Sequence, residues 1–108
     1  MSEREERIAR NEASSREINE NIEGAQPRSA DDQFRIVCEC GRRDCARLIA
    51  ISIPEYEAIR AEPTLFAVVN GHEIPHLEDV VRDTDRFSVV RKRAGVPAEV
   101  AVEEDPRG

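Results

Sequence analysis

Apolar residues recur at two different spacings along the chain, and the change of spacing predicts how the chain is organised. Residues 1–24 are polar except for isoleucines at helical intervals, which predicts a polar helical arm. Residues 25–33 are mostly turn formers and predict a linker. Residues 34–93 contain alternating and β-branched segments typical of a folded domain, whereas residues 94–108 predict a disordered acidic tail.

The isoleucine stripe of the N-terminal arm is thin and leaves two interpretations open. Ile8, Ile18 and Ile22 fall near one helical face, but so few apolar residues are too weak a seam for an isolated coiled coil. The helix therefore either stays frayed and solvated, or it docks these side chains on the core or on another protein.

The first half of the central region predicts a strand pair followed by a helix. Residues 34–38 and 46–51 have the composition of strands, and the short turn between them favours pairing. Ser52 and Glu55 have the spacing of a capping box, so a short helix is expected to begin after Ser52. Its apolar side chains are expected to face the core, and Arg60 to face water.

The second half predicts a further strand and a C-terminal hairpin. Residues 65–69 form the expected strand, which ends at an Asn-Gly turn. Residues 77–83 and 86–91 favour a hairpin, although the apolar spacing in 77–81 also fits a short helix. The predicted fold class is therefore α+β: a small domain with a cysteine-bearing first hairpin, one helix, a strand and a second hairpin, flanked by the polar helix and the tail.

Three cysteines and one histidine form the strongest chemical signal. Cys38, Cys40 and Cys45 have C-x-C-x4-C spacing across a predicted glycine turn, the arrangement of a zinc knuckle. His72 follows a second glycine turn and would complete the Cys3His ligand set of one structural Zn²⁺. His76 competes as the fourth ligand, but it follows a proline and is expected to begin the next element.

Other roles for the cysteines remain open. Three is an odd number, so at most one intramolecular disulfide could form, and a cytoplasmic protein keeps its thiols reduced. The charged N-terminal sequence lacks the apolar stretch of a secretory signal, and no apolar run is long enough to span a membrane, which favours the cytoplasm. The alternatives are ordinary cysteines and a redox-responsive thiol and zinc switch.

Charge narrows the choice of partners. The net charge of −7 is carried by the two ends, at −3 each, around a centre of −1. This acidity makes sequence-independent binding to nucleic acid or anionic lipid unfavourable, so another protein is the expected partner. The knuckle carries basic residues that could offset the charge of the metal site, remain solvated, or bind an anion such as nucleic acid together with residues 91–93. These residues are Arg42, Arg43 and Arg47.

Motifs typical of enzymes are missing from the sequence. It contains no P-loop, no G-x-G-x-x-G fingerprint and no nucleophile elbow, and a Cys–His dyad would lack a pocket-forming sequence around it. The predicted domain, residues 34–93, is small, and a hydrophobic core of that size alone seldom supplies more than about 3–5 kcal/mol of stability. A bound metal ion would add to the stability of such a domain. The sequence thus favours a non-enzymatic, zinc-stabilised interaction or regulatory module.

Four short segments together resemble an uncharacterised family of small actinobacterial proteins. They read CECG-x3-C from Cys38, EYE-x2-R from Glu55, GH at residues 71–72 and an aromatic-x-VV strand from Phe87. The resemblance covers about residues 34–93, with some likeness in the N-terminal arm. It implies that the three cysteines and His72 occur as a set, and it implies no activity.

Overall fold

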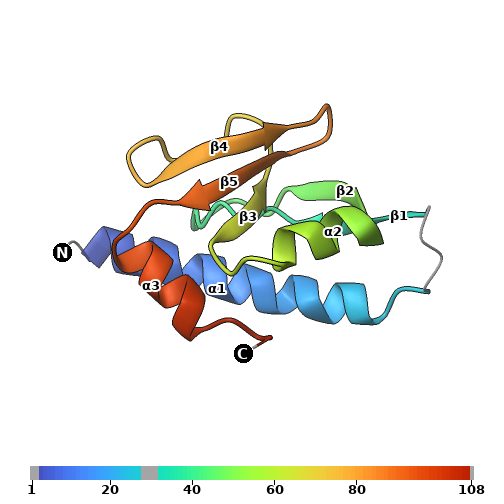
Figure 1. Ribbon diagram of the computed structural model, residues 1–108, viewed down its shortest axis with the longest axis horizontal. Coiled ribbons are helices and arrows are strands. Elements are labelled where there is room, and N and C mark those ends of the chain that lie inside the picture. Colours follow the sequence, from blue (N-terminus) through green and yellow to red (C-terminus); the bar gives the residue numbers. More distant parts are fainter. Residues whose placement is uncertain (1–2, 28–31, 108) are drawn as a thin grey trace.

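The computed structural model describes residues 3–27 and 32–107, and over this part of the chain it confirms an α+β fold. In chain order the elements are α1 (Glu3–Gly24), β1 (Gln33–Val37), β2 (Leu48–Ser52), α2 (Ile53–Arg60), β3 (Leu65–Val68), β4 (Glu78–Asp83), β5 (Ser88–Lys92) and α3 (Val96–Glu103). This part of the chain contains three helices and two antiparallel sheets, with α1 and α3 on the side of the molecule opposite the β4–β5 hairpin (Figure 1).

The first hairpin pairs β1 with β2, as the sequence predicts. Phe34 lies opposite Ile51 and Ile36 opposite Ile49, and all four side chains are buried. Cross-strand pairs of aromatic and β-branched residues stabilise such ladders and set their register. The hairpin therefore presents one apolar face to the core and delivers the cysteine loop at its tip.

Helix α2 begins at the predicted capping box. The backbone N–H of Glu55 donates to Ser52 Oγ, and the Glu55 carboxylate accepts from the backbone N–H of Ser52. The expectation that Arg60 faces water is wrong, because its side chain is buried and forms ion pairs with Asp105 and Glu20. Those partners come from α1 and from the C-terminal segment, which no local pattern connects to α2.

The second sheet has the order β3-β5-β4, and its β4–β5 hairpin confirms the strand interpretation over the short helix. The pairing shifts register between Val80 and Arg82, which marks a β-bulge. Phe87 and Val89 are buried, as the alternation predicts. Strand β5 lies between two neighbours and is mostly buried, whereas β4 is an edge strand with Val80 and Val81 exposed.

Helix α1 is docked on the domain, so the solvated interpretation of the N-terminal arm is wrong. It lies along one side of the molecule and contacts both β1 and α3 (Figure 1). Ile8 is buried with Ile74 and Leu77, and Ile22 packs against the main core. Ile18 is 49 % exposed, so only two of the three isoleucines dock within the chain.

The predicted disordered tail is also wrong for most of its length. Residues 96–103 form α3, which packs on α1 and buries Ala101 in the core. Pro97 stands in its first turn, where a proline is pre-organised for a helix and costs no hydrogen bond. Of the predicted linker, residues 28–31 lie outside the described part, and Gln33 already belongs to β1. Among the described helices, none combines the length and apolarity needed to cross a membrane.

The face that α1 buries is largely polar. Glu12, Arg16, Asn19 and Glu23 are all buried, although each is a residue type that sequence patterns place in water. The Lys92 ammonium of β5 donates to the carboxyl groups of both Glu12 and Glu78 of β4. These contacts join the helix to the second sheet, because buried charges are tolerated only when they are paired.

This buried carboxylate predicts a pH-dependent stability. Burial raises the pKa of Glu12 from 4.5 to about 8; the charges of Glu78 and Glu39 add to this, and Lys92 opposes it. The folded protein therefore holds a proton that the unfolded chain releases near pH 4.5. This contribution to the free energy of unfolding is present below that pH and is lost as the pH rises towards 8, by at most about 1.4 kcal/mol per pH unit.

Urea denaturation of the wild type and of Glu12→Gln between pH 5 and 8.5 measures this contribution. The glutamine side chain of the variant stays uncharged over this pH range. The free energy of unfolding of the variant is therefore expected to increase relative to that of the wild type as the pH rises. Parallel pH profiles for the two proteins would contradict the assignment.

Candidate metal centre

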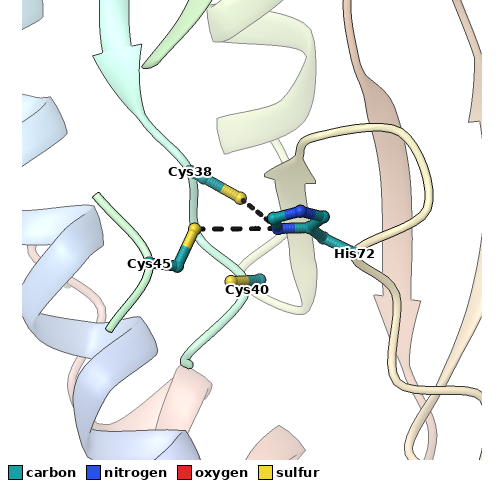
Figure 2. A group of neighbouring side chains, drawn as sticks. All are labelled: Cys38, Cys40, Cys45 and His72. Atoms are coloured by element: carbon teal, nitrogen blue, oxygen red, sulfur yellow. Dashed lines mark hydrogen bonds between the residues drawn. The ribbon is translucent and has the colours of Figure 1, made fainter. Parts of the chain in front are cut away.

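Cys38, Cys40, Cys45 and His72 come together at one point of the fold. One ligand atom from each lies within 4.8 Å of the other three. His72 Nδ1 is 3.8 Å from Cys38 Sγ and 3.6 Å from Cys45 Sγ, and Figure 2 shows both sulfurs directed at the ring. Four soft or borderline donors converging in this way could hold a metal ion.

Two glycine turns bring the four residues together. Cys38 directly follows β1, and its backbone N–H donates to the carbonyl of Arg47, which extends the first hairpin by one pair. Gly41 then turns the chain with φ +76°, in the left-handed region that glycine adopts without strain. Gly71, at φ +87°, turns the chain after β3 in the same way, and His72 N–H closes that turn on Val69 O.

Backbone N–H groups point at the sulfurs and favour their thiolate form. The N–H of Val69 donates to Cys38 Sγ at 3.2 Å, and the N–H of Arg42 donates to Cys40 Sγ. The hydrogen bond between the Cys38 and Cys40 sulfurs lowers the pKa of Cys40 and, together with burial, raises that of Cys38. A metal ion binds cysteine as thiolate, so an ion bound at this cluster would displace the thiol protons.

Buried polar residues behind the cysteines hold the loop in place. Asn19 of α1 bonds both to the backbone N–H and to the carbonyl of Val37, one residue before Cys38. Glu39, between the two cysteines, is fully buried and accepts from the Asn19 side chain and from Ala67 N–H of β3. The sequence pattern does not mark Asn19 or Glu39 as supports of the cysteine loop. The one sign of this role is that each is a polar residue near apolar or cysteine residues that face the core.

The remaining basic residues of the sequence analysis have separate positions. Arg42, Arg43 and Arg47 are all exposed, and Arg42 lies beside the cluster, because it donates to the carbonyl of His72 at 3.4 Å. His76 is exposed and is not part of the cluster found among the described residues. Residues 91–93 do not extend a basic surface, since each is already ion-paired with a carboxylate.

Gly41 predicts a test of the contact between the cysteine loop and α1. A Cβ at this position would lie 2.8 Å from the Ile8 carbonyl oxygen and equally close to the side chains of Ile8 and Glu12. Gly41→Ala is expected to destabilise the protein by about 2–5 kcal/mol, because left-handed strain and overpacking add. Gly71→Ala meets only open space and should cost about 1–2 kcal/mol from strain alone. Equal losses in thermal or urea denaturation would show that the loop does not pack on α1.

Comparison with protein-family models, curated proteins and solved structures finds no match for this chain. The resemblance to the actinobacterial family therefore stays a prediction. What the site does has to be argued from its geometry and chemistry.

Proposed function

We propose that this chain is a non-enzymatic interaction or regulatory module whose fold depends on one structural Zn²⁺, held by Cys38, Cys40, Cys45 and His72. The observation that carries the proposal is the convergence of four ligand atoms within 4.8 Å. They come from both ends of the β1–β2 loop and from the β3–β4 connection, so a bound ion would tie the two sheets together.

The spacing of these atoms fits a zinc tetrahedron. With Zn–S bonds of about 2.3 Å and Zn–N bonds of about 2.0–2.1 Å, neighbouring ligand atoms lie about 3.5–3.8 Å apart. The two sulfur-to-nitrogen distances that involve His72 are 3.8 and 3.6 Å. The four ligand atoms lie within 4.8 Å of one another, so the side chains would have to close in by at most about 1 Å to bind the ion.

The ligand types favour zinc in a structural role. Thiolates prefer soft or borderline metals and disfavour Mg²⁺ and Ca²⁺, which take oxygen ligands. Four protein ligands close the tetrahedron, whereas a catalytic zinc keeps one position open for water or substrate. The resulting centre carries a net charge of about −1, and Arg42 beside it offsets that charge.

Metal analysis of the purified chain tests the proposal. Protein prepared under reducing conditions is expected to contain one zinc per chain, with its three thiols protected until a strong chelator or a denaturant is added. Chelation should abolish the cooperative thermal transition, and added Zn²⁺ should restore it. Protein without stoichiometric metal that still melts cooperatively would overturn the proposal.

A further inference from the structure

A groove of about 820 Å³ lies next to the cysteine cluster, and neither the metal site nor the core accounts for it. Its walls are the N-terminal half of α1, the loop between Cys40 and Cys45, and the segment before β4. Asn11 Nδ2 donates to the carbonyl of Gly41 at 3.1 Å and holds the first two walls together. Its charged and titratable lining residues are Arg4, Arg7, Arg42, Arg43 and His76.

The groove is strongly basic in a protein that is acidic overall. Of the described residues, four arginines and a histidine line it and no aspartate or glutamate does, although the chain carries a net charge of −7. Arg4, Arg42 and Arg43 form no ion pair with any described residue, and Arg7 has only an exposed one with Glu3 at 3.9 Å. By contrast, Arg86, Arg91, Arg93 and Arg107 are all paired with carboxylates. Arg10, Arg35, Arg47 and Arg82 also lack an ion pair among the described residues, but they do not line the groove, whereas three unpaired guanidinium groups and that of Arg7 line it together.

The groove also has apolar walls. Ile8, Ile74 and Pro75 line it between the arginines. A site of this kind suits a ligand that combines an apolar or ring-shaped part with concentrated negative charge. Guanidinium groups match phosphate oxygens with paired hydrogen bonds. The positive charge of four guanidinium groups is greater than the single negative charge of a carboxylate, so a ligand with several negative charges fits better.

We propose that this groove binds a small ligand carrying two or more phosphates joined to an apolar or ring-shaped group, the chemistry of a nucleoside diphosphate or triphosphate. Arg42 and Arg43 from the cysteine loop and Arg4 and Arg7 from α1 bind the phosphates, and the walls formed by Ile74 and Pro75 receive the rest. This ligand site goes beyond the structural role of the metal, because none of the four proposed metal ligands is among the residues that line the groove.

Size and charge favour a small molecule over a nucleic acid strand. The volume lies within the range of about 300–1,000 Å³ that small-molecule sites occupy. A strand would have to extend past the groove over a molecule of net charge −7, and residues 91–93, which could have extended the basic surface, are already paired.

Calorimetric titration of the zinc-loaded full chain with adenosine diphosphate, and separately with pyrophosphate, tests the proposal at constant ionic strength. Both probes are expected to bind, and adenosine diphosphate more tightly. The double variant Arg42→Gln/Arg43→Gln should weaken binding by about tenfold for each arginine removed, because each loses charge-assisted hydrogen bonds.

The matched control is Arg35→Gln/Arg47→Gln, which changes the net charge equally but at two exposed arginines outside the groove. It should bind both probes within about twofold of the wild type, since distant surface charges are screened. Zinc content and melting temperature of each variant confirm that the fold is kept. Equal losses in the two double variants, absence of binding by both probes, or tight binding of a single-stranded oligonucleotide without binding of pyrophosphate would each overturn the proposal.

Discussion

Cys38→Ser is expected to yield protein without stoichiometric zinc and without a cooperative thermal transition. Serine retains the hydrogen bond from Val69 N–H but provides no thiolate, so the ion loses one of its four ligands. Structural zinc contributes about 10–16 kcal/mol of apparent binding free energy to folding, which is comparable to the whole stability of about 5–15 kcal/mol of a domain. Elemental analysis and circular dichroism melting measure the two effects.

The two histidines supply the control for this prediction. His72→Gln should release zinc at a lower chelator concentration than the wild type, whereas His76→Gln should leave metal content and melting unchanged. His76 is exposed and apart from the cluster, so its substitution changes no predicted ligand. An unchanged melting transition in Cys38→Ser, or identical behaviour of the two histidine variants, would contradict the ligand assignment.

Arg16→Met is expected to destabilise the fold by about 3–5 kcal/mol without removing a metal ligand, because it leaves a buried charge without its partner. Arg16 is 1 % exposed, faces the fully buried Glu39 and stacks 3.7 Å over the Phe66 ring. Its guanidinium also donates to the carbonyls of Pro63 and Leu65, at the start of β3. Methionine fills most of the volume but satisfies none of these groups.

Urea denaturation of zinc-loaded protein at pH 7 measures this loss. Arg10→Met is the matched control, since Arg10 lies on the exposed face of the same helix, and it should change stability by about 0.5 kcal/mol or less. The double variant Arg16→Met/Glu39→Gln should recover part of the loss, because it removes the unpaired charge. Equal effects at Arg10 and Arg16 would show that the buried contacts of α1 contribute nothing.

The elements whose formation depends on residues close together in the sequence could be predicted. Alternation in residues 34–38 and 86–91 marks the strands, and Ser52 with Glu55 marks the start of α2, because these patterns act within a few residues. The spacing of the cysteines and the two glycine turns likewise predict the cluster. Here chemistry and local geometry agree.

The ends of the chain could not be predicted in this way. The hydrophobic pattern of α1 is weak, and what docks the helix is a polar face on which Glu12, Arg16 and Asn19 each meet a partner from a distant strand or loop. Residues 96–103 form a helix because α1 offers a surface to pack on, which composition alone does not reveal. The prediction for α1 failed because sequence patterns place polar residues in water, whereas the prediction for residues 96–103 failed because a short apolar helix depends on the distant surface that it packs against.

Residue type and short-range spacing are enough to predict the strands, the capped helix and the three cysteine ligands, with His72 favoured over His76 as the fourth. That α1 and α3 belong to the domain, and that Arg4 and Arg7 meet Arg42 and Arg43 in one groove, follows only from contacts between distant parts of the chain. The environment of a polar side chain depends on the group that lies opposite it in the folded protein. An arginine that faces a carboxylate or a carbonyl is held in the core, whereas one that faces solvent is free to bind a ligand. The residues that supply the carboxylate or carbonyl lie far away in the chain.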